Sequence, residues 1–211
     1  MSEEEHSTYL QKVYTAADNR DLEAAYDNWA KKYDAHVNAF GYQIPAVAAG
    51  LIGRYVKSGD SPILDAGAGT GLMGQILDAM GYTGQIGIDM SVGMMDLAEK
   101  RGVYIDLRQM ILGDPLDFPD NYFAACQSMG VFTAGHAPSN AFDELTRVVR
   151  PGGSIIFSLL EKVYIGGGFK EKFDQLEASQ KWALLERTKA FPGLPLEDPT
   201  LLHRVFVYSV L

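Results

Sequence analysis

Three glycines at alternate positions follow a carboxylate near the middle of the first half of the chain. Asp65 closes a short apolar run, and Gly67, Gly69 and Gly71 come directly after it. Glycine adopts the positive φ values of a tight turn and, having no Cβ, lets a ligand lie against the backbone. Apolar residues then recur at helical spacing, and the N–H groups that begin a helix attract a negative group. The stretch therefore predicts a strand, a turn and a helix that bind a nucleotide-like ligand.

Polar side chains also close two other predicted strands. A second strand, 85–89, ends in Asp89, and Ser91 is placed to cap the helix after it. Gln127 and Ser128 stand at the end of the fourth strand, 122–129. Ligands of open α/β sheets bind beyond the carboxyl ends of the strands, so we expect these side chains to face one site.

The order of these elements predicts a three-layer α/β sandwich. Strands and helices alternate from residue 63 to 160, which implies parallel pairing with right-handed crossovers. The last two β-rich runs, 182–191 and 203–211, follow each other without a helix and should pair as an antiparallel hairpin at one edge. The expected fold is a seven-stranded, mostly parallel sheet with an antiparallel C-terminal hairpin.

The N-terminal segment predicts a helical cap over that sheet. Between Leu22 and Phe40 apolar and aromatic side chains recur in steps of three and four, which places Tyr26, Trp29 and Tyr33 on one helical face. We expect Trp29 to be buried in the core, and an alternative reading is a lid whose tyrosines reach the reacting centre. We therefore divide the single domain, 1–211, into a lid at 1–60 and a ligand-binding core at 61–211.

Composition narrows the classes of function. The net charge of -9 argues against nucleic acid, whose phosphates require a basic surface. No apolar run approaches the roughly 20 residues that span a bilayer. The acidic first residues are unlike a signal or transit peptide, and the single cysteine, Cys126, leaves no internal disulfide. We expect a cytoplasmic protein.

Two protein families have similar glycine loops, and they differ in where the first glycine falls relative to the end of the strand. Gly69, Gly71 and Gly74 satisfy G-x-G-x-x-G, the dinucleotide fingerprint. In that fingerprint the first glycine normally follows the strand immediately, whereas here Gly67 and Ala68 come first. The string Leu-Asp-Ala-Gly-Ala-Gly-Thr-Gly instead resembles the first motif of class I S-adenosylmethionine-dependent methyltransferases.

The resemblance extends over nearly the whole chain and is closest to the Williams–Beuren-region methyltransferase-like family. The segments that carry it are 26–34, 63–71, 87–95 with 101–104, and 144–153. It implies a Rossmann-like methyltransferase fold, S-adenosylmethionine as cofactor and S-adenosylhomocysteine as product.

The resemblance also places the cofactor contacts. Gly67, Gly69 and Gly71 would lie under the methionine end and ribose, and Asp65 would accept from the ammonium or bond local backbone. Asp89 would accept from both ribose hydroxyls, since two donors match two carboxylate oxygens. The remaining contacts implied are Met90 against adenine or in the core, Asp114 and Pro115 at the adenine amino group, and Gln127 and Ser128 beside the sulfonium.

Methyl transfer from a sulfonium is an in-line displacement that needs alignment and exclusion of water rather than a metal. The four histidines are scattered, and we expect no metal site. A base is needed only where the acceptor must lose a proton. The candidates for that base or for substrate orientation are His136, in the loop after the fourth strand, with Tyr26, Tyr33 and His36 from the lid.

Three functions remain open on the sequence. The first is methyl transfer to a small-molecule acceptor by a monomer or homodimer, with no nucleic acid or membrane partner. The second is a cofactor-binding module without catalysis. The third is a nicotinamide-dependent oxidoreductase, which should show a set such as Tyr-x-x-x-Lys, whereas Tyr164 is followed four residues later by Gly168.

Overall fold

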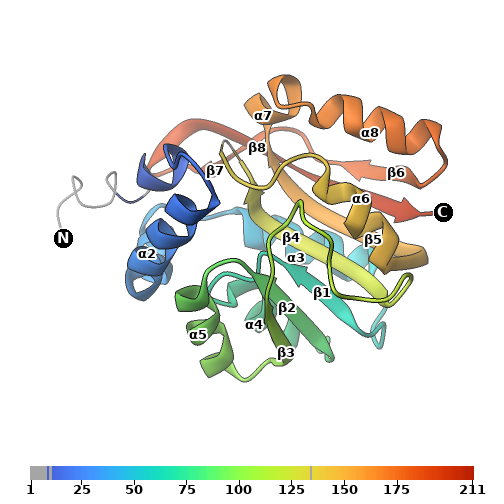
Figure 1. The fold of residues 1–211 in the computed structure, drawn as a ribbon, viewed down its shortest axis with the longest axis horizontal. Helices are drawn as coiled ribbons and strands as arrows, with labels where there is room; N and C mark the ends of the chain where they lie inside the picture. The colour runs from blue at the N-terminus through green and yellow to red at the C-terminus, as the bar shows by residue number, and fades with distance from the viewer. Residues whose placement is uncertain (1–8, 10, 134) are drawn as a thin grey trace.

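The computed structural model describes residues 9, 11–133 and 135–211 (Figure 1). Its strands are β1 (Ile63–Ala66), β2 (Gln85–Asp89), β3 (Tyr104–Gln109), β4 (Phe123–Phe132), β5 (Val149–Leu160), β6 (Trp182–Arg187), β7 (Phe191–Leu194) and β8 (Asp198–Val210). Its helices are α2 (Asn19–Ala39), α3 (Ile44–Tyr55), α4 (Leu72–Ala79), α5 (Val92–Arg101), α6 (Ala141–Val148), α7 (Glu161–Gly166) and α8 (Phe169–Ala178).

The sheet has the mixed arrangement that the alternation predicts. Its order is β3-β2-β1-β4-β5-β8-β6, with β7 paired to β8. Strands β1 to β5 pair in parallel, and β8 runs antiparallel to both β5 and β6. The predicted α/β fold with its antiparallel C-terminal pair is confirmed.

The strand count differs from the expected seven. The run 182–191 is divided, because residues 188–190 leave the sheet between β6 and β7. Strand β8 is 13 residues long, and its first part pairs with β7 while its second part pairs with β6. Pro192, which has no N–H to donate, lies on the short edge strand β7. The expected hairpin is therefore a three-stranded antiparallel unit that makes the sheet eight-stranded.

Helices cover both faces of the sheet, and alternate side chains of one strand enter two different cores. Phe157 of β5 packs with Phe142 and Phe173 from α6 and α8. Its neighbour Ile156 points the other way and joins Ile52 of α3 in the second core. This period of two is what a strand buried on both faces requires.

Helix α2 lies at one end of the sheet beside α5 (Figure 1). It begins at Asn19, because the Asp18 carboxylate accepts from the N–H of Asp21 and caps the first turn. Trp29 is buried as expected, at 2% exposure. No helix in the described ranges is long and apolar enough to cross a membrane.

Candidate functional site

The carboxyl ends of β1, β2 and β4 meet at one edge of the sheet, as predicted. In the parallel register Asp65 of β1 stands between Gly87 of β2 and Gln127 of β4. The glycine loop follows β1, and the turn into α5 follows β2. The polar strand ends and both loops therefore face the same space.

Gly67 occupies a position in the loop where a side chain does not fit. Its φ is +86°, in the left-handed region, and a Cβ at this position would lie 2.2 Å from Cγ2 of Val131. The N–H groups of Gly67 and Ala68 donate to the carbonyl of Ile88, at 2.8 and 2.9 Å. The loop is therefore held against β2 by its own backbone, and these two donors are not directed at a ligand.

Asp89 joins the two loops through backbone donors. Its Oδ2 accepts from the N–H of Gly69 at 2.8 Å, and its Oδ1 accepts from the N–H of Ser91 at 2.9 Å. Ser91 in turn caps α5 by accepting from the N–H of Met94. Burial raises the pKa of the Asp89 carboxyl, and the backbone hydrogen bonds oppose that rise. Each oxygen still has lone pairs that a ligand hydroxyl can use.

Asp65 is buried more deeply and is bonded by a side chain. It is 2% exposed, and its Oδ2 accepts from the hydroxyl of Tyr104 at 2.6 Å. Burial raises the pKa of its carboxyl to about 7, although the Tyr104 hydrogen bond lowers it. The carboxyl is thus poised to ionise when a cation arrives beside it.

Gln127, opposite Asp65, has a buried side-chain amide whose oxygen and nitrogen make no hydrogen bond of good geometry, although the amide lies close enough to Asp65 to lower the pKa of that carboxyl. Its residue is 1% exposed. An unpaired buried amide is unfavourable by about 1–3 kcal/mol. Such an amide beside a cavity indicates a polar ligand.

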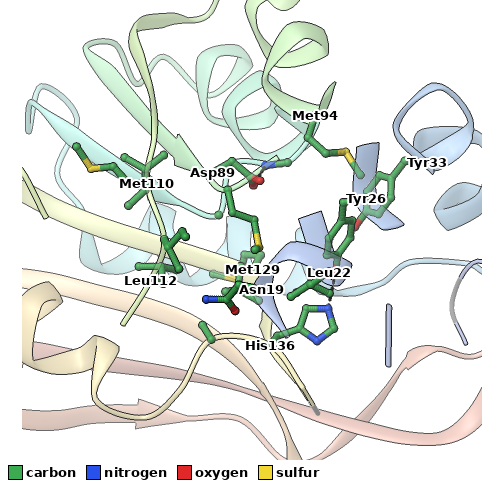
Figure 2. Close-up of a pocket in the computed structure, with 18 residues that line it drawn as sticks. Asn19, Leu22, Tyr26, Tyr33, Asp89, Met94, Met110, Leu112, Met129 and His136 are labelled. Carbon is green, nitrogen blue, oxygen red and sulfur yellow. Dashed lines mark hydrogen bonds between the residues drawn. The ribbon is translucent and has the colours of Figure 1, made fainter. Parts of the chain in front are cut away.

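Three adjoining cavities surround these residues. The main cavity has about 710 Å³ of empty space, part of it open to solvent, and its wall includes Asp89, Met90, Met110 and Leu112 (Figure 2). A loop cavity lies along the glycine loop and is lined by Asp65, Gln127 and others. A lid cavity lies under α2. Tyr33 belongs to the wall of all three, so the cavities converge on its side chain.

Tyr26 and His136 meet across the main cavity. The Tyr26 hydroxyl lies 2.8 Å from Nε2 of His136 (Figure 2), and the hydroxyl of Thr133 lies 2.9 Å from Nδ1. The two residues come from α2 and from the loop after β4, 110 positions apart. Burial raises the pKa of the Tyr26 phenol well above its usual value, so the phenol stays protonated at neutral pH.

Two aspartates fasten α2 to the two loops. Asp27 accepts from the hydroxyl of Ser91 at 2.5 Å and from the N–H of Gly93 at 2.9 Å, at the start of α5. Asp34 accepts from the hydroxyl of Thr70 in the glycine loop and from the guanidinium of Arg101. The helix that covers the cavities is therefore attached to the loops that form their floor.

The chain is similar to proteins of a known family. The model of the methyltransferase domain family matches residues 64–157. Methyltransferase-like protein 27 of Homo sapiens is 31% identical over 163 residues, which are 74% of this chain and 66% of the human protein. These matches support a class I S-adenosylmethionine-dependent methyltransferase. The resemblance seen in the sequence is thereby confirmed, and S-adenosylmethionine is the cofactor of this methyltransferase family.

Solved structures share the methyltransferase fold. A chain from the complex of the Haloferax volcanii Trm112 methyltransferase activator with a methyltransferase has a TM-score of 0.63 at 18% identity, covering 88% of this chain and 97% of its own. Geranyl diphosphate C-methyltransferase of Streptomyces coelicolor, solved with S-adenosylhomocysteine, has a TM-score of 0.62 at 13% identity, covering 85% and 84%. The chain spans 66% or less of the length of each curated relative it matches.

The residues around the loop cavity and the main cavity fit S-adenosylmethionine. The loop cavity offers a carboxyl and an unpartnered amide, which suit an ammonium and a carboxylate. The main cavity offers a second carboxyl among methionine and leucine side chains, which suits a ribose with an attached flat base. Gly67, Gly69 and Met129 line both cavities and would lie where the two halves of the cofactor join.

The structure places some predicted site residues away from the cavities. Asp114 and Pro115 are exposed, and Ile111 and Leu112 line the main cavity in their place. Ser128 is fully buried and donates to the carbonyl of Ala66 at 2.6 Å, which ties β4 to β1.

Two further candidates have roles in the fold. Gly71 is the N-cap of α4, with φ +82°. His36 is buried and accepts from the Trp29 indole at 2.9 Å, outside the three cavity walls.

Tyr104, which donates a hydrogen bond to Asp65, was not among the predicted site residues. A Cβ on Gly74 would lie 2.3 Å from the Tyr104 hydroxyl, and one on Gly71 would lie 3.1 Å from its ring. The glycines therefore make room for this tyrosine as well as for a ligand. The spacing of the glycines is consistent with this role, but the role can be recognised only once β3, which carries Tyr104, is known to lie beside β2.

Proposed function

We propose that the protein transfers a methyl group from S-adenosylmethionine to a small-molecule acceptor by in-line displacement. The cofactor supplies a methyl on a positively charged sulfur, and that bond breaks as an electron pair of the acceptor bonds the methyl, leaving S-adenosylhomocysteine. The observation that carries the proposal is the convergence of three cavities on Tyr33. Two suit the halves of the cofactor, and the third leaves room for an acceptor.

Each half of the cofactor has residues suited to it. We propose that Asp89 accepts from the ribose hydroxyls, as its position between the loops supports. Asp65 would receive the methionine ammonium, and the Gln127 amide would satisfy its unpaired atoms on the methionine end. Met90 lines the main cavity and would lie against adenine. For the adenine amino group, Asp114 and Pro115 stay a prediction.

The N-terminal segment would act as a lid that excludes water from the reacting centre. Helix α2 supplies Tyr26 and Tyr33 to the cavity walls, and its aspartates hold it on both loops. The division into a lid at 1–60 and a core at 61–211 remains our proposal, and residues 1–8 and 10 lie outside the described residues. Exclusion of water strengthens the electrostatic interactions within the site.

The Tyr26–His136 pair favours catalysis over a module that only binds the cofactor. A protonated phenol and an imidazole 2.8 Å apart at a cavity wall can relay a proton. The oxidoreductase alternative has no comparable support, because the family is that of methyltransferases. We propose a monomer or homodimer that acts in the cytoplasm on a small molecule without nucleic acid, consistent with the net charge of -9.

Isothermal titration tests the proposal. S-adenosylmethionine, S-adenosylhomocysteine and NADH are titrated into the wild type, Asp89→Ala and Asp96→Ala, a control in the exposed part of α5. We expect micromolar binding of both adenosyl ligands, at least tenfold weaker binding in Asp89→Ala, no change in the control, and no heat with NADH. Binding of NADH instead, or equal affinities in wild type and Asp89→Ala, would show that the site assignment is wrong.

A further inference from the structure

The lid cavity has a wall whose chemistry bears on the methyl acceptor. Its wall is built from α2, from the segment before it, from the loop after β4 and from β7 and β8. About 480 Å³ of empty space lies inside it, part of it open to solvent. Aromatic and aliphatic side chains dominate, with Trp29, Phe40, Val37 and Leu194 among them. The cavity is therefore shaped for an apolar or aromatic body.

The described wall of the lid cavity contains no aspartate, glutamate, lysine or arginine. Its titratable members are four tyrosines and His203. Burial raises the pKa of all four phenols, and burial lowers the pKa of the His203 imidazole. These groups are all uncharged at neutral pH. The tyrosines are Tyr14, Tyr26, Tyr33 and Tyr42.

An uncharged wall selects against charged ligands. A desolvated ion without a partner is strongly unfavourable, and the wall offers neither a cation for a carboxylate nor a carboxylate for an amine. The nearby carboxylates that act on these phenols are Asp34, Asp89 and Asp198. Asp34 and Asp89 are already engaged by donors from the loops, and Asp198 accepts from Thr200. None of them lines the lid cavity.

The lid cavity adjoins the main cavity at the Tyr26–His136 pair. Tyr26, Tyr33 and Gly130 line both this cavity and the main cavity. Thr133 belongs to the lid-cavity wall and His136 to the main-cavity wall, and they hold each other at 2.9 Å. A molecule in the lid cavity would therefore present its reactive atom to Tyr26 and to the point where the three cavities meet.

We propose that the lid cavity is the acceptor subsite and takes an uncharged aromatic or aliphatic molecule with a weakly acidic O–H or S–H, a phenol or a thiol, whose proton leaves through Tyr26 to His136. The inference rests on the proposed methyl transfer. It deepens that function by naming the class of acceptor and the path of the proton. Phenols and thiols titrate near 10 and 8.5, so a base assists them at neutral pH.

The proton balance follows from the hydrogen bonds. With a hydrogen on Nδ1, His136 donates to the hydroxyl oxygen of Thr133 and accepts at Nε2 from Tyr26. The acceptor gives its proton to the Tyr26 oxygen as Tyr26 gives its own to Nε2. The acceptor's electron pair forms the new bond to the methyl carbon. His136 ends as an imidazolium, which loses its proton to water afterwards.

The first test is a matched acceptor panel. Phenylmethanethiol and phenol are compared with 4-(mercaptomethyl)benzoate, 4-hydroxybenzoate and tyramine, with S-adenosylhomocysteine production measured at saturating cofactor. Binding is measured separately by quenching of tryptophan fluorescence with anisole and thioanisole in the presence of S-adenosylhomocysteine, since Trp29 lines the cavity. We expect the uncharged acceptors to exceed their charged analogues at least tenfold in kcat/KM, and the two ethers to quench.

The second test fills the cavity. Leu194 is 6% exposed and lines the lid cavity, whereas Leu196, two residues further on, is 76% exposed. We expect Leu194→Phe to lower kcat/KM for the acceptor at least tenfold and to reduce ether quenching, with the Kd for S-adenosylmethionine within twofold of wild type. Leu196→Phe, the same change outside the cavity, should match wild type in all three.

The third test examines the relay. His136→Gln should lower kcat most at low pH and recover as the acceptor ionises by itself, and Thr133→Val should shift the same profile in part. If the wild type did not bind S-adenosylmethionine, the proposed function itself would be contradicted. Three other results, each obtained with a wild type that binds the cofactor, would overturn the acceptor inference alone. They are a preference for the charged acceptors, an inert acceptor panel, and no effect of Leu194→Phe.

Discussion

Asp65, one residue before the end of β1, and Asp89, the last residue of the neighbouring parallel strand β2, have carboxyls in different chemical settings. Asp89 lies between two backbone N–H donors from two loops. Asp65 is 2% exposed, and the hydroxyl of Tyr104 is its hydrogen-bond donor. The same residue type near the carboxyl end of a strand therefore has its oxygens directed by the main chain in one case and by a side chain in the other.

The difference shows how one sheet edge can serve two ends of a ligand. Backbone donors oppose protonation of Asp89 and keep its lone pairs oriented for hydroxyl groups. Burial with a phenol donor leaves Asp65 with a pKa of about 7, so a cation must arrive to complete its ionisation. We expect substitutions at Asp65, near the end of β1, to change both the pH dependence of cofactor binding and the stability of the protein. Substitutions at Asp89, at the end of β2, should change these two quantities less.

Gly67→Ala should have the largest effect. A Cβ there would lie 2.2 Å from Cγ2 of Val131 at φ +86°, so both overlap and strain arise. Strain of this kind amounts to about 1–3 kcal/mol. We expect a lower melting temperature and cofactor binding at least a hundredfold weaker by titration. Gly102→Ala has φ +66° with no atom near the new Cβ, so it measures strain alone and should leave binding unchanged.

The pH dependence of cofactor binding should follow Asp65. Because its pKa is about 7 before binding, a ligand that requires the carboxylate should bind about tenfold more tightly at pH 8 than at pH 6. Titration across that range in buffers of different ionisation enthalpy should show proton release. In Asp65→Asn the binding should be weaker and independent of pH, and a wild-type affinity that does not change with pH would contradict the assignment.

The same carboxyl has an effect on stability with the opposite sign. Its pKa is raised on folding from an ordinary value near 3.8, so the native state holds more protons between about pH 4 and 7. Its contribution to the free energy of unfolding is therefore complete below pH 4 and is lost as the pH rises through 7. Urea unfolding of wild type and Asp65→Asn should diverge over this interval.

Gln127→Met should stabilise the ligand-free protein while weakening cofactor binding several-fold. The substitution removes two buried polar atoms that make no hydrogen bond of good geometry, and it preserves approximate volume. We expect a gain of about 1–2 kcal/mol in the free energy of unfolding, measured with urea. Gln85→Met is the matched control, because the Gln85 amide nitrogen donates to the carbonyl of Gly74 at 2.9 Å and only the amide oxygen lacks a partner. That variant should lose stability instead.

Tyr104→Phe should have the smallest effect, a few-fold at neutral pH. It removes the hydroxyl that lowers the pKa of Asp65, so the midpoint of pH-dependent binding should move upward. The free energy of unfolding should fall by about 1 kcal/mol. Binding at pH 9 should nearly match wild type. Tyr122→Phe, at an exposed tyrosine, is the control, and equal midpoints in the two variants would remove Tyr104 from the site.

Local patterns were sufficient to predict the parallel half of the fold. The strand-turn-helix at Asp65 and the cap at Ser91 are encoded in neighbouring residues, and both are confirmed. The division of 182–191 was not predictable in this way. It depends on the length of β8, which pairs with two strands at once.

The site shows the same limit. Asp65, Asp89 and Gln127 could be chosen because strand ends of a parallel sheet meet at one edge. The hydrogen bond from Tyr104 to Asp65 and the meeting of Tyr26 with His136 are long-range contacts between separate elements. His136 and Tyr26 were candidates by residue type, and only the fold brings their side chains together.

The attachment of α2 to both loops has a consequence for the order of events in turnover. The helix must break its hydrogen bonds from Asp27 and Asp34 before it can swing away from the cavities. Those bonds end on the loops that would hold the cofactor. A bound cofactor that steadies the loops would therefore lengthen the dwell time of the closed helix. Departure of products would then set the pace of the cycle, and the cofactor would enter first and leave last.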